Sequence, residues 1–491
     1  MDHLGWLDLP AHTIRIKTEL EGFAQEVAEA GYKQVAVIGM GGSSLASEVF
    51  ASVFRDEQDR LPLQVVDSTH PMSIRAADAS FSAGRTLFIV SSKSGTTLET
   101  MSLFKYFWSQ AIEQSEAPGE NFVAITRPGT PLAQIGQTRN FRRIFHAPGN
   151  VGGRYSALTE FGMVPAAAIG APLSILIRGA TNAATQCGPD MPIFDNPGLV
   201  LGAFLSECTL HRRDKATFLS TVFKSFVPWI EQLVAESTGK SGTGIVPVGG
   251  DEDALSYGTD RMLISLGHKE NNGLSISQED LPTAQIFFGE EDLLGVMFIF
   301  EVAVAVTGAS LRIHPFNQPD VQLAKQLTHR AITAKSDSER VAGVTASSPD
   351  LADQIRNWSS GSSSPDYLAV QAYIPRTNST QSALNALRRL FRDSYGIATT
   401  VEFGPRFLHS TGQLHKGGPA TGRFLQIVDE PAEDIPVPDT GFTFGGLIQA
   451  QADGDYRALE SLGRRVLRVS LGSQGGDGLA SLLAAAQTAI E

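Results

Sequence analysis

Cysteine is scarce in this chain, whose 491 residues include only Cys187 and Cys208. Two thiols cannot form a disulfide framework, and such low cysteine usage is typical of a reducing compartment. The two residues also lack the closely spaced cysteine and histidine partners of a structural zinc site. We therefore expect no metal site and a cytoplasmic location.

Long apolar runs and an excess of basic charge are missing as well. No run reaches the roughly eighteen consecutive apolar residues of a membrane-spanning helix. The start of the chain, MDHLGWLDLP, lacks the basic head and apolar run of a secretory signal. The net charge is −13, whereas nucleic-acid binding requires a basic surface. We therefore expect no membrane or nucleic-acid partner, although a few gathered cations could still bind a small anion.

The sequence does contain alternating strand and helix patterns. Apolar runs such as QVAVI at 34–38 and LFIV at 87–90 are followed by turn residues and then by helical periodicity. Repetition of strand, turn and helix indicates an α/β protein with parallel sheets covered by helices on both faces. A chain of this length exceeds one ordinary core, so several domains are expected.

The pattern divides the chain into three units. A second series of strands and helices begins after about residue 160, and WSSGSSSP at 358–365 has the composition of a linker. We expect domains at 1–160 and 161–357, a linker at 358–365 and a C-terminal α/β region at 366–491. Near the end of the second domain, Ser310 to Ile313 is expected to form a strand.

The strand at 87–90 leads into a loop made of hydroxyl, ammonium and glycine residues, SSKSGTT at 91–97. The N–H groups and the macrodipole at a helix N-terminus favour anions, and parallel sheets bind ligands beyond the carboxyl ends of their strands. A Ser/Thr-rich turn with an N-cap is the simpler alternative, but one cap requires fewer hydroxyls. The loop therefore predicts a phosphate site formed by Ser92, Lys93, Ser94 and Thr97.

A second loop, GMGGSS at 39–44, follows the first strand and is rich in glycine. A dinucleotide site is the alternative interpretation, but G-x-G-G-S departs from the G-x-G-x-x-G pattern, and Asp67 is the sole acidic candidate to hold a ribose. Because two loops of one sheet are both rich in hydrogen-bond donors, a single phosphorylated ligand is a simpler interpretation than a dinucleotide. Gly42 and Ser43 are therefore added to the candidate binding residues.

Five segments carry a family resemblance. GMGGSSLASEV and SSKSGTTLET resemble the sugar-isomerase (SIS) domain, a flavodoxin-like unit that binds phosphosugars. VGGRYSALTEFG, QLVAESTGK and NQPDVQLAK resemble motifs of the phosphoglucose isomerase family, in family order within about residues 1–330. Together with GPRFLHSTGQLHKGGP, the chain is most similar to the isomerase portion of bifunctional transaldolase/phosphoglucose isomerase proteins. The resemblance implies two flavodoxin-like SIS domains, and a C-terminal region that completes the active site.

Glu236 is the candidate base. Its surroundings predict a helix that begins near Pro228 and ends at Gly239, with Gln232 and Glu236 on one face. A carboxylate near the negative end of a helix dipole is discouraged from ionising, which suits a proton acceptor. From the residues alone, a solvated glutamate is the simpler interpretation. The resemblance makes Glu236 the group that moves a proton between neighbouring carbons, with Gln232 in the substrate site.

The resemblance also assigns roles to Arg154, Gln318 and Lys325. Arg154 follows two glycines, so its loop can approach a ligand closely, and the matching family residue lies beside the enediolate. Pro319 is expected to open a helix that carries Gln318 and Lys325 two turns apart on one side. The resemblance implies that Gln318 contacts the phosphate and that Lys325 helps to open the ring. A turn arginine and a solvated lysine are the simpler interpretations of these residues.

The histidine departs from the family pattern. The resembled family usually carries its ring-opening histidine soon after the E-S-x-G-K segment, whereas DEDALSYGTDRM at 251–262 contains none. The pattern L-H-S-x-G-Q occurs instead at 408–413, and we expect this segment to fold back to the same pocket. His409 is then the acid and base, with His415 as the alternative; histidine suits this role because its ordinary pKa is about 6.5.

The resemblance implies that the function is interconversion of glucose 6-phosphate and fructose 6-phosphate by ring opening and proton transfer through a cis-enediol. No cofactor or metal is expected, because the chemistry is proton transfer alone. The alternatives are an isomerase of another phosphosugar, a non-catalytic or regulatory phosphosugar-binding protein, and a nicotinamide-dependent enzyme. The resemblance also suggests a homodimer and a functional link to a transaldolase.

Overall fold

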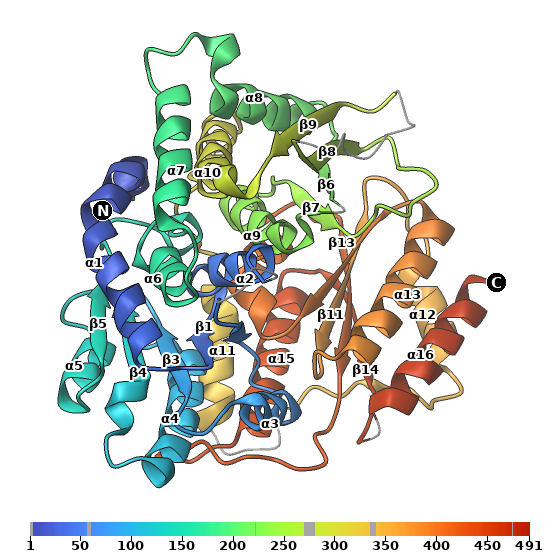
Figure 1. Ribbon diagram of the computed structural model, residues 1–491. Helices are drawn as coiled ribbons and strands as arrows, with labels where there is room; N and C mark the ends of the chain where they lie inside the picture. Colours follow the sequence, from blue (N-terminus) through green and yellow to red (C-terminus); the bar gives the residue numbers. More distant parts are fainter. Residues whose placement is uncertain (1–2, 56–59, 221, 270–279, 334–339, 474) are drawn as a thin grey trace.

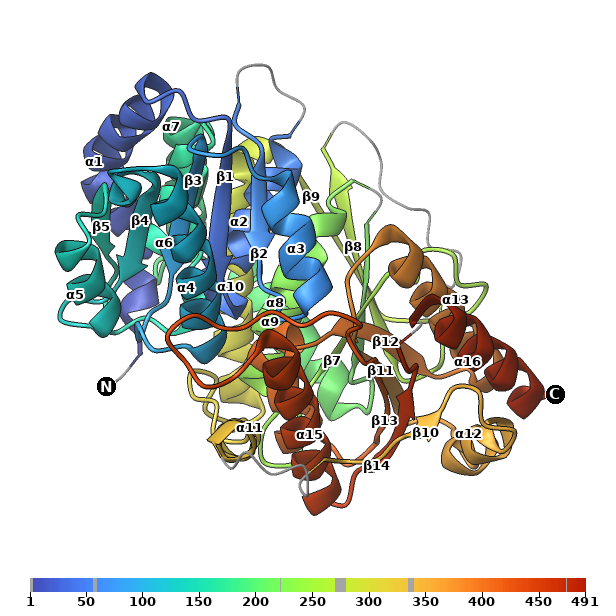
Figure 2. The same cartoon turned by 90° about the horizontal axis from the view of Figure 1, so that it is seen from below.

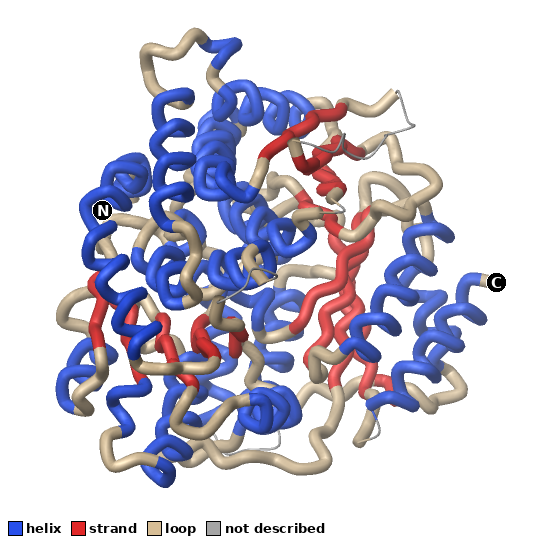
Figure 3. Tube along the Cα trace, viewed as in Figure 1, coloured by secondary structure: helices blue, strands red, loops and turns tan. Residues whose placement is uncertain are grey.

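Figure 1 shows the computed structural model, which describes residues 3–55, 60–220, 222–269, 280–333, 340–473 and 475–491. Three parallel sheets lie among helices in this part of the chain (Figure 3). The expected α/β class, with parallel sheets flanked by helices, is confirmed.

The strands are β1 (Gln34–Gly39), β2 (Leu63–Val66), β3 (Thr86–Ser91), β4 (Phe122–Thr126), β5 (Arg143–His146), β6 (Lys215–Leu219), β7 (Val246–Gly249), β8 (Arg261–His268), β9 (Thr283–Phe288), β10 (Val344–Thr345), β11 (Tyr367–Tyr373), β12 (Ala398–Phe403), β13 (Gly422–Val428) and β14 (Arg465–Ser470). The helices are α1 (Leu9–Glu29), α2 (Leu45–Val53), α3 (Pro71–Ser80), α4 (Leu98–Gln114), α5 (Pro131–Thr138), α6 (Glu160–Ala168), α7 (Leu173–Gln186), α8 (Pro197–Leu210), α9 (Val227–Thr238), α10 (Leu293–Ser310), α11 (Gln322–Thr333), α12 (Leu351–Ser359), α13 (Asn378–Tyr395), α14 (Gly412–Gly417), α15 (Phe444–Ser461) and α16 (Gly475–Ile490).

The first sheet has the strand order β2-β1-β3-β4-β5. This is the flavodoxin-like order, in which ligands bind at the carboxyl ends of β1 and β3, where the order reverses. Side chains from α1, α2 and α6 pack on one face of the sheet, and side chains from α3, α4 and α5 pack on the other. With both faces covered, β3 is buried at every position, and its centre is the continuous apolar run 87–90.

The second sheet has the order β7-β6-β8-β9, and its core is continuous with one face of the first sheet. The segment Glu290–Ser310, which includes α10, is long and apolar enough to cross a membrane by length and composition alone. However, 67% of its apolar window is buried, and α7, α8 and α9 pack against α10. A helix that is apolar on every side is expected in such a core.

The third sheet belongs to the C-terminal unit and has the order β10-β14-β13-β11-β12. Its strands β12, β11, β13 and β14 repeat the 2-1-3-4 order of the other sheets, a repetition that the sequence does not reveal. Helices α12, α13 and α16 cover its outer face (Figure 1). Its inner face packs against β7 and α9, and α15 lies between this sheet and α11 (Figure 2).

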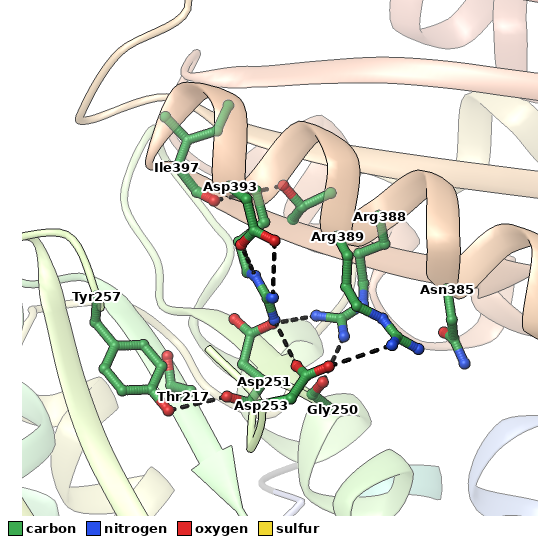
Figure 4. Close-up of polar contacts among 12 residues, drawn as sticks. Thr217, Gly250, Asp251, Asp253, Tyr257, Asn385, Arg388, Arg389, Asp393 and Ile397 are labelled. Carbon is green, nitrogen blue, oxygen red and sulfur yellow. Dashed lines mark hydrogen bonds and ion pairs between the residues drawn. The ribbon is translucent and has the colours of Figure 1, made fainter. Parts of the chain in front are cut away.

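A buried aspartate joins the C-terminal unit to the second sheet. Asp251, which follows β7, is fully buried and contacts Arg388 and Arg392 of α13 as well as Arg261 of β8. Figure 4 shows Asp251 and Asp253 facing the arginines of α13. Removing one partner from such a network would leave an uncompensated buried charge, so these contacts hold the two units in one relative position.

Two local predictions were wrong. Ser310 to Ile313 is not a strand, because α10 continues to Ser310 and the backbone N–H groups of Leu311 and Ile313 then bond to Thr307 and Gly308 of the same helix. The turn that follows therefore satisfies the end of the helix rather than a sheet.

The helix after Pro319 begins later than predicted, at Gln322. The backbone N–H of Asp320 donates to Gln413 Oε1 at 3.0 Å, which ties this stretch to α14 as a loop. Gln318 therefore lies in a loop and does not share a helix face with Lys325.

The expected linker packs against its neighbours. Trp358 and Ser359 belong to α12, and Arg423 donates to the carbonyl oxygens of Trp358 and Ser360. The domain boundaries themselves stay a prediction.

Candidate active site

The loops that follow β1 and β3 meet at the carboxyl edge of the first sheet. Ser91 Oγ donates to the carbonyl oxygen of Ser43 at 2.7 Å. Residues Gly41–Ser43 form the short turn η2, which packs against the turn η4, Gly153–Tyr155. The two glycine-containing motifs of the sequence, far apart along the chain, therefore form adjoining walls of one site.

The loop 92–97 precedes α4 and carries several hydroxyls. Ser92 Oγ and Thr97 Oγ1 lie 3.0 Å apart, and the backbone N–H of Gly95 donates to Ser92 Oγ at 3.1 Å. Gly95 has a φ of 67°, a conformation that favours glycine. Ser94 Oγ accepts hydrogen bonds from Thr96. The loop thus holds its hydroxyls at the N-terminus of a long helix, an arrangement that suits an anion.

Lys93 extends from this loop towards the turn that carries Arg154. Its Nζ donates to the carbonyl oxygen of Val151 at 2.5 Å. Burial lowers the pKa of Lys93, and the charges of Arg127 and Arg154 lower it further. Positive charges therefore gather beside the hydroxyl-rich loop in a chain whose net charge is negative.

Arg154 is buried and reaches Glu236. Its Nη1 lies 3.2 Å from Glu236 Oε1 and 2.8 Å from Gln318 Oε1. Its Nε donates to Ser237 Oγ at 2.7 Å, and Nη2 donates to the carbonyl oxygens of Pro315 and Asn317. The guanidinium is thus fixed by α9 and by the loop before α11, with one side against the candidate base.

Glu236 lies in the last turn of α9, and the predicted helix with Gly239 at its end is confirmed. Gln232, one turn earlier, donates from Nε2 to Glu236 Oε2 at 3.1 Å and to the carbonyl oxygen of His409 at 2.7 Å. The Glu236 side chain is only 10% exposed. Contacts from Gln232 and Arg154 therefore fix both carboxylate oxygens in orientation.

His409 lies in the turn η9, Arg406–His409, and its side chain contacts α4. Its Nε2 is 3.0 Å from Oε1 of Glu99, in the first turn of α4. Burial would raise the pKa of Glu99, but the charge and hydrogen bond of His409 and the charge of Lys325 lower it to about 2. Glu99 is therefore an ionised partner that orients the imidazole through Nε2.

The glycine loop contacts the same residues. A Cβ added to Gly41 would lie 2.6 Å from the carbonyl oxygen of His409 and 2.8 Å from Gln232 Nε2. The structure therefore brings the glycine loop, His409, Gln232, Glu236 and Arg154 together. Lys325 lies on an exposed face of α11, close enough to Glu99 to affect its pKa.

His415 lies apart from this group. Its side chain is buried between Gln371, whose Nε2 is 3.1 Å from Nδ1, and Glu402, whose Oε1 is 3.5 Å from Nε2. Of the two candidate histidines, His409 is the one that contacts the residues of the glycine and hydroxyl-rich loops.

Glu99 and Ser237 are contacts that the sequence reasoning missed. Both lie inside quoted motifs, SSKSGTTLET and QLVAESTGK, where they could have been chosen for their polar groups. No local pattern indicated that Glu99 would contact His409, because His409 lies 310 residues away in the chain.

In the part of the chain that the structure describes, no group of three or more histidine, cysteine or acidic residues is arranged to hold a metal ion. Cys187 and Cys208 are both free thiols.

Replacing Gly42 by alanine is expected to reduce catalytic activity at least a hundredfold and to destabilise the fold. The added Cβ would lie 2.0 Å from the carbonyl oxygen of Gly153 and 2.9 Å from the backbone nitrogen of Arg154, so η2 and η4 would have to separate. Steady-state kinetics and urea unfolding would measure the effect. Gly153→Ala is the matched control, because its Cβ meets nothing within 4 Å; equal losses in both variants would contradict this explanation.

A cavity of about 760 Å³ lies between α9 and the C-terminal unit, and it is not the site described above. Glu231 of α9 lines it, whereas Glu236, five positions later, turns to the other side. Burial and the neighbouring charge of Glu402 raise the pKa of Glu231 to about 8.

This raised pKa predicts a pH-dependent stability. Between the ordinary glutamate pKa and about 8, the folded chain binds a proton at Glu231 that the unfolded chain has released, so stability falls as the pH rises through this range. Glu231→Gln removes this dependence. We expect the variant to match the wild type at pH 5 and to exceed its free energy of unfolding by roughly 2 kcal/mol at pH 9. Urea unfolding at both pH values tests this, with the exposed Glu113→Gln as control; a wild-type advantage at pH 9 would contradict it.

Taken together, the flavodoxin-like sheet, the hydroxyl-rich loop at a helix N-terminus and the carboxylate held by Arg154 and Gln232 define an α/β enzyme site suited to a small phosphorylated ligand. A family model described as phosphoglucose isomerase matches residues 16–262, half of the chain. The chain therefore belongs to the phosphoglucose isomerase family.

Individual proteins similar to this chain include glucose-6-phosphate isomerases. The chain is 26% identical over 392 residues to a glucose-6-phosphate isomerase of Streptococcus gordonii, covering 66% of this chain and 86% of that protein. The enzyme of Streptococcus thermophilus is also 26% identical, over 387 residues, with the same coverage.

Among solved structures, the chain is similar to a Thermus thermophilus protein described as hypothetical, with a TM-score of 0.61 and 22% identity over 68% of this chain and 91% of that one. It is also similar to a glucose-6-phosphate isomerase of Chlamydia trachomatis, with a TM-score of 0.57 and 20% identity over 71% and 77% of the two chains. These two likenesses bear on the fold alone.

Proposed function

We infer that this chain is an aldose-ketose isomerase that interconverts glucose 6-phosphate and fructose 6-phosphate. The observation that carries the inference is the contact of Glu236 with Arg154 and Gln232, which fixes a carboxylate in the site where the glycine and hydroxyl-rich loops meet. Family membership and the glucose-6-phosphate isomerases among the relatives support the choice of substrate.

The phosphate is proposed to bind at the N-terminus of α4. Ser92, Ser94 and Thr97 supply hydroxyls, while Lys93 supplies charge, with Gly42, Ser43 and Gln318 alongside. Together these groups hold the dianion and leave the sugar carbons to extend towards α9. Binding the phosphate end in this way orients the substrate, so that its reacting carbons lie near Glu236.

Ring opening is the first proposed step. His409 gives a proton from Nδ1 to the ring oxygen as the bond from that oxygen to C1 breaks, and the C1 hydroxyl gives its proton to a water molecule as the aldehyde forms. Glu99 accepts a hydrogen bond from Nε2 and keeps the ring in place. Lys325, which lies near Glu99, is proposed to assist on the same side of the substrate.

Proton transfer through a cis-enediol is the second step. Glu236 removes the proton from C2 of the open aldose and returns it to C1, while a proton moves from the C2 hydroxyl to the C1 oxygen. Arg154 stabilises the negative charge of the enediolate, since a fixed donor of this kind contributes about 3 kcal/mol to a transition state. The positions of Gln232 and Ser237 support this role by holding Glu236 and Arg154 still.

A coupled assay tests the function. Fructose 6-phosphate is supplied, and a NADP-dependent glucose-6-phosphate dehydrogenase reports the glucose 6-phosphate formed. We expect turnover without added metal or cofactor. Faster conversion of a different phosphosugar would favour an isomerase with another substrate, and tight binding of sugar phosphates without turnover would favour a regulatory protein.

We also propose that the protein is a cytoplasmic homodimer. Phe194, in the turn between α7 and α8, is 92% exposed, and α7, α8, α10 and β9 line an apolar groove of about 670 Å³. These features suit contact with a second copy, which sedimentation equilibrium would detect. A functional link to a separate transaldolase stays a prediction from the family resemblance.

A further inference from the structure

Gln451 of α15 contacts the carboxylate that holds His409. Its Nε2 donates to Glu99 Oε1 at 2.7 Å, and its own Oε1 accepts a hydrogen bond from Thr69 Oγ1 at 2.8 Å. The Gln451 side chain is buried. Because both ends of the amide are engaged, its orientation is fixed with the NH₂ group towards Glu99.

Glu99 Oε1 therefore receives two donors, Gln451 from one side and His409 from the other. A carboxylate that accepts one hydrogen bond can still rotate, whereas hydrogen bonds from two separate elements hold it in one orientation. We propose that Gln451 is a positioning residue, which sets the orientation of His409 through Glu99. This inference rests on the proposed function, and it concerns a residue outside the segment matched by the family model.

The same helix also packs against α11, the helix that carries Lys325. Alpha-helix α15 packs so closely on α11 that a Cβ at Gly454 would lie 2.9 Å from the carbonyl oxygen of Ala324, the residue before Lys325. Two buried ion pairs, Lys416 with Asp455 and Arg468 with Asp453, anchor α15 to α14 and β14 within the C-terminal unit. The C-terminal unit therefore supports both the residue that orients His409 and the helix that carries Lys325.

The first test is Gln451→Leu, which removes the donor to Glu99 and puts an apolar side chain of similar size in its place. A hydrogen bond to a charged group is worth enough to change kcat about ten- to a hundredfold. We expect this loss with fructose 6-phosphate, with KM changed less than about threefold because the phosphate loop is untouched. 5-Deoxyfructose 6-phosphate, which lacks the hydroxyl needed to close the ring, should be converted at nearly the wild-type rate.

The second test is Gln451→Glu, which keeps the shape of the side chain. When ionised, the new carboxylate repels Glu99; when protonated, it donates to Glu99 and accepts from Thr69 as the amide does. The kcat of this variant relative to wild type should rise about tenfold between pH 8 and pH 6. A residue that served only to stabilise the fold would give no such recovery on acidification.

Gln449→Leu on the same helix is the control, because Gln449 donates to Asp453 rather than to Glu99. Equal losses on the ring-closed and open-chain substrates, or no recovery of Gln451→Glu at pH 6, would overturn the proposal. If Gln451→Leu does not fold, the pH response of Gln451→Glu decides alone. A wild-type protein without isomerase activity would instead refute the proposed function, so the two failures are distinguishable.

Discussion

Glu236→Gln is expected to lower kcat by about 10²- to 10⁴-fold while the affinity for sugar phosphate changes little. General base catalysis contributes an effect of this size, and an amide cannot accept the C2 proton. The glutamine retains the shape of the side chain and one acceptor for Arg154 or Gln232, so the site keeps its geometry. The phosphate loop lies on another element and should bind as before.

Two measurements would test this result. Steady-state kinetics gives kcat and KM, and NMR in deuterated water follows exchange of the C2 hydrogen of glucose 6-phosphate, which should stop in the variant. Glu231→Gln is the matched control, since it lies on the same helix but lines the separate cavity. Retention of C2 exchange in Glu236→Gln would assign the base to another residue.

His409→Ala is expected to slow ring-closed substrates by about 10²- to 10³-fold and open-chain substrates much less. The reason is that the proposed proton donation from His409 is needed to break the ring but not to move the proton between C2 and C1. Fructose 6-phosphate and 5-deoxyfructose 6-phosphate separate the two steps directly. In the plot of kcat against pH for fructose 6-phosphate, one of the two sloping sides should also be absent in this variant.

The matched comparison is His415→Gln. His415 is buried between Gln371 and Glu402, so we expect its replacement to lower thermal stability without changing the ratio of rates on the two substrates. Equal losses of His409→Ala on both substrates would argue against ring opening by His409. A substrate-dependent loss in His415→Gln would transfer the role to that residue.

The local parts of the site could be predicted from short segments. The helix α9 and its end at Gly239 follow from Pro228, the apolar periodicity and the glycine itself, and this places Gln232 and Glu236 on one face. The loop 92–97 follows from the change from apolar to hydroxyl residues at the end of β3. In both cases the deciding interactions lie within one or two turns of chain.

Strand β8 shows why other parts could not be predicted. It begins with Arg261, a charge that argues against a buried strand, but this side chain contacts Thr217 on β6 and Asp251 after β7. The loop that carries Gln318 is a similar case. The backbone N–H of Asp320 donates to Gln413 Oε1, and this contact favours a loop where the sequence predicted the start of a helix. These partners are distant in sequence, so no local pattern records them.

The sequence by itself determined the chemical groups of this protein and the short elements that carry them, because helix faces, turns and strand ends depend on neighbours within a few residues. Only the tertiary structure shows that His409 rather than His415 contacts Glu99, that Gln451 donates to the same carboxylate, and that the C-terminal unit packs against α9. Those outcomes depend on packing and charge pairing between residues hundreds of positions apart, which become neighbours only when the three sheets assemble.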